Sequence, residues 1–140
     1  GYSKEWINQR LKSIEIRKEL TDEWQERGAE KTDYAILTDE ISKAWSDMTT
    51  KEYKQLKNLK KENLRDNMSN LELILNMLAE TSTKEIHRNE DSEGVDKLKD
   101  DAKAGGDVAG TARRKLEKKL GRSVVSEDNF LSNKDKKKLS

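Results

Sequence analysis

A narrow stripe of small and apolar residues in the last third of the chain constrains its fold more than any other feature. Its members recur at alternating steps of three and four residues: Val95, Leu98, Ala102, Gly105, Ala109, Ala112, Leu116 and Leu120. This spacing places them on one face of an α-helix, in the pattern of a face that contacts another helix. Because the centre of the stripe is Ala and Gly, a neighbouring backbone can come close there. We call this stripe the seam and expect it to be pressed against another helix.

The paired glycines Gly105 and Gly106 leave the continuity of this helix open. A glycine inside a helix costs about 1 kcal/mol relative to alanine, so a break at the pair is one outcome. The three-four spacing keeps its phase across the pair, which favours one continuous helix. We expect Ser92 to cap its start and Gly121 to follow its end.

The composition indicates an all-helical protein with little core. Proline is absent, which favours long helices. Only 31% of the residues are hydrophobic and 41% are charged, a thin supply for one compact core. We expect an all-α, elongated domain of about five helices, in which long first and last helices surround a central apolar helix. A second copy or another domain would complete its core.

Capping signals predict where the earlier helices begin. Ser3 and Gly28 bound a long first helix, and Asp33 precedes a second one. Thr49 and Ser69 each stand three residues before a glutamate, the form of a capping box that opens a third and a fourth helix. In the fourth helix, apolar residues cover nearly the whole circumference, which predicts the buried centre of the domain: Leu71, Leu73, Ile74, Leu75, Met77, Leu78 and Ala79.

The first helix carries apolar residues on two opposite sides. One side holds Ile7, Leu11 and Ile14, and the other holds Trp6, Ile16, Leu20 and Trp24. A helix of this kind lies between two layers. These are either two layers of its own domain or the domain and a partner.

The chain divides into three parts by composition. We expect a helical core in residues 1–90, the seam helix and a short extended segment in residues 91–125, and a flexible basic tail in residues 126–140. The polar stretch 89–94 predicts a linker or a mobile loop. The tail contains the lysine-rich run 134–138. The chain begins without methionine, so we expect it to be part of a longer protein.

The sequence offers little catalytic or metal-binding chemistry. His87 is the only histidine and cysteine is absent, which leaves no plausible zinc site or histidine-based catalytic site. We expect His87 to be exposed near a helix end. The carboxylates stand beside lysines at helical spacing, which predicts solvated helix faces. We therefore expect no enzyme activity, cofactor or metal. No apolar stretch has membrane length, and the lack of cysteine fits a reducing cytoplasm.

A basic cluster around the third helix is the second candidate for function. Its residues are Lys51, Lys54, Lys57, Lys60, Lys61 and Arg65, and a nucleic-acid contact would use the last five. Such a cluster can neutralise the phosphates of DNA. Neighbouring carboxylates such as Glu62 dilute it, no aromatic residues are interleaved for base stacking, and the net charge is only +1. The residues therefore favour a solvated face over a DNA contact.

Several separated blocks resemble one family of phage proteins. Residues 34–45 (YAILTDEISKAW) and 59–70 (LKKENLRDNMSN) are similar to the C-terminal region of prophage antirepressor proteins of the BRO type. Residues 1–11 resemble the segment that follows their N-terminal BRO domain, and residues 103–113 and 121–125 resemble their closing segment. A more distant likeness to DNA-damage-inducible protein D lies around residues 59–61 and 68–69.

This resemblance implies a bacterial cytoplasmic protein, often encoded by a prophage, in phage or damage-response regulation. In the family, DNA binding is assigned to the N-terminal BRO domain, which this sequence does not contain. The helical C-terminal region would then serve assembly or contact with another protein, such as a repressor. The family supplies no catalytic residue.

Together these observations predict a non-enzymatic interaction domain. Its partner would be a repressor or a second copy of the chain in a homodimer. The interface residues that we expect are Leu98, Ala102, Gly105, Ala109, Ala112 and Leu116 of the seam, with Trp6, Leu20 and Trp24 of the first helix. The alternative is a DNA-binding module that uses the basic cluster.

Overall fold

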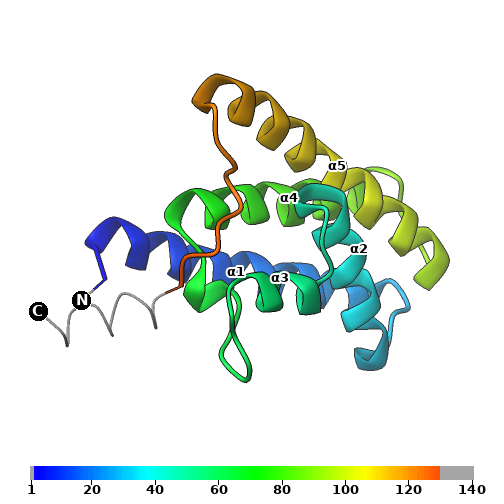
Figure 1. Cartoon of the computed structure of the whole chain (residues 1–140). Helices are drawn as coiled ribbons and strands as arrows, with labels where there is room; N and C mark the ends of the chain where they lie inside the picture. Colours follow the sequence, from blue (N-terminus) through cyan, green and yellow to red (C-terminus); the bar gives the residue numbers. More distant parts are fainter. Residues whose placement is uncertain (1, 130–140) are drawn as a thin grey trace, which may run out of the picture.

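The computed structural model describes residues 2–129, which form helices and their connections without any strand (Figure 1). The elements in chain order are α1 (Lys4–Glu26), η1 (Lys31–Asp33), α2 (Tyr34–Ser46), α3 (Thr50–Leu56), η2 (Arg65–Asn67), α4 (Asn70–Asn89) and α5 (Val95–Leu120). The two η elements are single 3-10 turns. The expected all-α fold with long first and last helices is confirmed. Within residues 2–129, no helix has both the length and the apolar character needed to cross a membrane.

The predicted caps set most helix starts. The Ser3 side chain accepts a hydrogen bond from Trp6 N, and complete capping boxes open α3 at Thr49 and α4 at Ser69. Gly28 has a φ of +98°, the left-handed conformation that ends a helix. Asp33 precedes α2, but its side chain forms no cap bond there. It accepts from Glu30 N at 2.9 Å instead.

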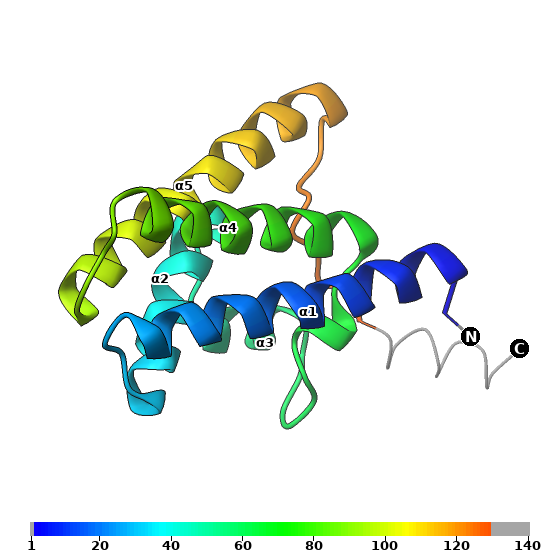
Figure 2. The ribbon, with the colours of Figure 1, turned by 180° about the vertical axis from the view of Figure 1, so that it is seen from behind.

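Helices α1 and α4 lie side by side and run in the same direction (Figure 2). Near their starts, Trp6 Nε1 donates to Met68 O at 2.8 Å. Near their ends, Arg88 Nε lies 2.6 Å from Glu23 Oε1. The short helices α2 and α3 connect the two long ones. The core between these elements contains fully buried side chains from four of the helices: Leu20, Trp24, Leu37, Trp45, Tyr53, Leu73 and Ala79.

Helix α4 is central, although one of its sides faces solvent. It packs against α1, α2 and α5. Ile74 and Leu78 retain 40% and 38% of their surface exposed. The prediction of burial around nearly the whole circumference is therefore wrong at this side, because no described element covers it.

Helix α5 is continuous through its paired glycines and packs on both α2 and α4. A Cβ on Gly105 would lie 2.6 Å from Thr83 N of α4, and one on Gly106 would lie 2.7 Å from Ile41 O of α2. The expected close helix contact is therefore present, and the seam packs against helices of the same chain. Gly106 and Gly110, outside the predicted stripe, also contact α2.

The connection before α5 is held in place, and the prediction of a linker or mobile loop is wrong. Gly94 N donates to Arg27 O at 2.9 Å, and the Ser92 side chain is buried against Asp101. Ser92 therefore does not cap α5. Gly94 occupies the cap position, with a φ of +86°.

After α5, residues 121–129 cross back over the bundle (Figure 1). Val124 and Val125 are buried, and the Lys57 ammonium of the α3 end donates to Ser126 O and Asp128 O. The first residues of the predicted flexible tail are therefore packed. The lysine-rich run 134–138 lies outside the described residues.

Candidate functional site

Five cationic side chains from four segments of the chain line one open groove. They are Arg17 of α1, Lys51 and Lys54 of α3, Lys60 of the following loop and Arg65 of η2. The groove has a volume of about 590 Å³. Asp39 is the only carboxylate among its described lining residues, and its Oδ1 accepts from Thr50 N at 3.1 Å. We call this feature the basic groove.

Local structure fixes where these cations lie. Lys51 and Lys54 are three residues apart on α3 and so share a helix face. Asn63 Oδ1 accepts from Arg65 N at 2.9 Å, which shapes the turn into η2. Arg17 Nη2 donates to Thr38 Oγ1 at 2.6 Å, so α2 holds this arginine at the groove.

One buried carboxylate lies behind the groove. Glu80, only 1% exposed, accepts hydrogen bonds from Arg17 Nη1 at 3.2 Å, from Arg65 Nη2 at 3.3 Å and from Asn76 Nδ2 at 3.1 Å. Burial lowers the pKa of Arg17, and Glu80 opposes this shift. An arginine nevertheless stays protonated at neutral pH. Two guanidinium groups thus share a single carboxylate, which leaves the groove positive.

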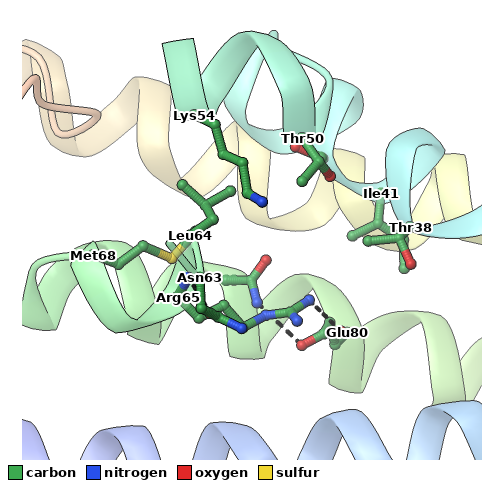
Figure 3. Close-up of a pocket in the computed structure, with 11 residues that line it drawn as sticks. Thr38, Ile41, Thr50, Lys54, Asn63, Leu64, Arg65, Met68 and Glu80 are labelled. Carbon is green, nitrogen blue, oxygen red and sulfur yellow. Dashed lines mark hydrogen bonds and ion pairs between the residues drawn. The ribbon is translucent and has the colours of Figure 1, made fainter. Parts of the chain in front are cut away.

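A smaller, more enclosed pocket of about 150 Å³ adjoins the groove (Figure 3). The two share Thr38, Thr50, Lys54 and Arg65 in their linings. In Figure 3, Lys54 extends from α3 into the space above Asn63 and Arg65. The lining also contains three buried apolar side chains: Ile41, Leu64 and Met68.

The structure separates the predicted basic cluster. Lys54, Lys60 and Arg65 line the groove, whereas Lys61 is exposed outside its lining. Lys57 cannot contact nucleic acid, because its side chain is fully buried. The prediction is therefore wrong at Lys57. Arg17 was missed because only tertiary packing brings α1 to this place.

Lys57 belongs instead to a buried network that joins α3, α4 and the C-terminal segment. Its ammonium lies 2.9 Å from Glu72 Oε1, and both side chains have no exposed surface. The Tyr53 hydroxyl donates to the other oxygen of Glu72. Burial raises the pKa of Tyr53, and the neighbouring Glu72 charge adds to the shift. With Ser126 O and Asp128 O also bound, the Lys57 charge serves structure.

His87 is fully buried, so the prediction of an exposed histidine is wrong. Its Nε2 lies 3.0 Å from Trp24 Nε1, which can only donate, so the histidine proton is on Nδ1 and points to Asp101 Oδ2 at 2.8 Å. Burial lowers the pKa of His87. Burial alone would raise the pKa of Asp101, but hydrogen bonds from Lys97, Ser92 and His87 lower it overall. Both imidazole nitrogens are occupied, so His87 is not free for catalysis or metal binding.

The first helix presents the opposite face from the one expected at an interface. Leu20 and Trp24 have no exposed surface and Trp6 has 9%, so these residues belong to the chain's own core. Ile7, Leu11 and Ile14 are 42%, 60% and 51% exposed. We call these three residues the outer stripe of α1.

The seam residues are likewise unavailable to a partner. Leu98, Ala102 and Ala109 have no exposed surface, and Ala112 and Leu116 are partly buried against the same core. Gly105 contacts Thr83. The prediction that the seam and the tryptophan face form an intermolecular interface is therefore wrong, because both faces pack inside the chain.

Within residues 2–129, no group of histidine, aspartate and glutamate side chains has the geometry to hold a metal ion. A scan against models of protein families finds no match for this chain, and no curated protein matches its sequence.

Proposed function

We propose that this chain is a non-enzymatic binding domain that contacts the phosphate backbone of nucleic acid through the basic groove. The observation that carries the proposal is the convergence of Arg17, Lys51, Lys54, Lys60 and Arg65 on one open surface. Lys51 and Lys54 form no ion pair with any described carboxylate, so their charges are available to phosphates. Glu80 balances only one of the two arginines.

The groove favours backbone contact over reading of bases. Its described lining contains no aromatic side chain on which a base could stack. Lysine and arginine contacts to phosphates are independent of base sequence, and they weaken as the salt concentration rises. Each phosphate neutralised steepens the slope of log K against log salt concentration by about 0.7 to 0.9. We therefore expect binding with little sequence preference and a marked salt dependence.

The resemblance to BRO-type antirepressors supports a setting for this activity. On that basis we propose that the domain is part of a cytoplasmic regulator of phage or damage-response genes. There the groove would add a nonspecific contact to the sequence recognition assigned to the N-terminal BRO domain.

Fluorescence anisotropy with labelled single- and double-stranded oligonucleotides over a salt series tests the proposal. The variant Lys51→Gln/Lys54→Gln removes two groove charges, and Lys118→Gln/Lys119→Gln removes the same charge from the exposed end of α5. We expect the groove variant to bind more weakly and to reduce the salt slope by about 1.4 to 1.8, if both lysines neutralise phosphates. The control keeps the wild-type slope. Equal losses of affinity in the two variants would contradict the proposal, as would the absence of binding by the wild type at low salt.

The lysine-rich run 134–138 needs its own control, because it also attracts phosphates. Substitution of Lys136, Lys137 and Lys138 by glutamine leaves the groove intact. We expect this variant to retain most of the affinity. Complete loss would assign binding to that run instead.

A second candidate function, contact with another protein, is supported by the outer stripe of α1. Three large apolar side chains at helical spacing remain exposed there, which is typical of a helix contact site. A homodimer through this stripe would sediment with a concentration-dependent mass, and Leu11→Lys would abolish that dependence. Identical monomeric sedimentation of both proteins contradicts self-association.

A further inference from the structure

The enclosed pocket beside the basic groove is rich in hydrogen-bond donors that lack acceptors. The Lys54 ammonium forms no hydrogen bond or ion pair with the described residues. The Arg65 guanidinium adds a second positive charge to the lining, and its Nη2 atom donates to Glu80. A half-buried ammonium without an acceptor favours a ligand that supplies one.

Two neutral side chains add further donors. Asn63 Oδ1 already accepts from Arg65 N and Asp66 N, which leaves the Asn63 amide nitrogen as a donor at the pocket. The Thr50 hydroxyl also lines the pocket. Thr38 does not contribute, because its hydroxyl accepts from Arg17 and donates to Tyr34 O.

The carboxylate that lines the pocket is already engaged. The Glu80 carboxylate takes three hydrogen bonds, two of them from guanidinium groups. The positive charges of Lys54, Arg65 and Arg17 therefore exceed the single negative charge of the Glu80 carboxylate. A ligand with several acceptor oxygens and more than one negative charge complements this arrangement. A phosphomonoester has both properties: three terminal oxygens and a charge of about −1.5 to −2.

We propose that this pocket binds the terminal phosphate of a nucleic-acid strand whose backbone lies in the basic groove. The proposal rests on the function given above and names the part of the strand that the site recognises. A cavity of about 150 Å³ admits a group the size of benzene, which is ample for a phosphate. An internal phosphodiester carries a sugar on each side, and the pocket would have to admit both sugars with it. A terminal phosphate needs room only for itself and connects to the groove through Thr50, Lys54 and Arg65.

Anisotropy with three oligonucleotides of one sequence tests the proposal: one with a 5′-phosphate, one with a 3′-phosphate and one with hydroxyls at both ends. We expect one phosphorylated end to bind about tenfold more tightly than the hydroxyl ends, as a few added charge-assisted hydrogen bonds would give. Inorganic phosphate should weaken binding of that oligonucleotide only to the level of the unphosphorylated one. Equal affinity for all three overturns the pocket assignment and leaves the groove function standing. No binding of any of them overturns both.

Two variants of similar size separate the pocket from the groove. Asn63→Asp keeps the Oδ1 acceptor of the turn but replaces the amide donor with a negative oxygen, and Thr50→Val removes the hydroxyl. We expect both to lose the preference for the phosphorylated end. Because Thr50 also lines the groove, the quantity measured for this variant is the ratio of its affinities for the phosphorylated and unphosphorylated strands, which should fall to about one. A preference that survives in both folded variants overturns the proposal. Tighter binding of a phosphoserine peptide than of the phosphorylated strand overturns the choice of nucleic acid.

Discussion

The indole of Trp24 in α1 donates a hydrogen bond of 3.0 Å to the Nε2 atom of His87 in α4. Both side chains are fully buried. Asp101 of α5 accepts from the opposite nitrogen of the same imidazole, so one histidine joins the three longest helices of the protein. This histidine is a structural group and holds the ends of α1 and α4 against the start of α5.

The burial of His87 predicts a specific dependence of stability on pH. The pKa of His87 is lower in the folded protein than in the unfolded chain. Below about pH 6.5, the histidine therefore takes up a proton in the unfolded chain more readily than in the folded protein. The free energy of unfolding should therefore fall as the pH drops from 7 to 5. In His87→Gln the protein is less stable at pH 7, but this slope is flattened, since the sequence has no other histidine. Urea unfolding at several pH values measures both quantities, and an unchanged slope in the variant contradicts the assignment.

The close approach of α5 to α4 predicts that Gly105 tolerates no large side chain. A Cβ there would lie 2.6 Å from Thr83 N, and Thr83 is fully buried. We expect Gly105→Leu to lower the free energy of unfolding by at least about 2 kcal/mol, because a packed backbone cannot move aside cheaply. Ala104→Leu, at an exposed position of the same helix, is the control and should change stability by less than about 0.5 kcal/mol. Similar thermal melts of the two variants would contradict the structure of this contact.

The ion pair between Lys57 and Glu72 predicts strong coupling between the two residues. Lys57→Met leaves the buried Glu72 carboxylate without its cation, and we expect a loss of about 3 to 5 kcal/mol. The double variant Lys57→Met/Glu72→Leu should recover part of this loss, because no unpaired charge remains. Chemical unfolding of the two single variants and the double variant provides the cycle. Additive effects of the two substitutions would show that the charges do not interact.

The two faces of α1 predict opposite effects for similar substitutions. Leu20 has no exposed surface, so Leu20→Ala should cost about 2 to 5 kcal/mol. Leu11 is 60% exposed, so Leu11→Ala should change stability by less than about 0.5 kcal/mol in the monomer. Thermal melts at low protein concentration measure both. A large loss at Leu11 under these conditions would show that this face is covered.

Features that depend on neighbours within one or two helical turns can be predicted from the order of the residues. The capping boxes at Thr49 and Ser69 and the left-handed residue at Gly28 were predicted from residue types at fixed short spacing. The three-four period of the seam likewise predicted the contact face of the last helix and favoured a continuous helix, although the paired glycines left a break open. In the candidate site, Lys54, Lys60 and Arg65 could be identified as a cluster because they lie close together in the chain.

Which of these faces are covered depends on how the helices pack together. The sequence shows two apolar faces on α1 but not that α4 and the core take Trp24 and leave Leu11 in solvent. The sequence shows a cluster of lysines. It does not show that Lys57 is buried against Glu72. Nor does it show that Lys54 lines a groove to which α1 contributes Arg17. The burial of His87 likewise requires Trp24 and Asp101, which lie on two other helices. Periodicity and caps reflect contacts within a helix, whereas burial and charge depend on which distant helices pack together.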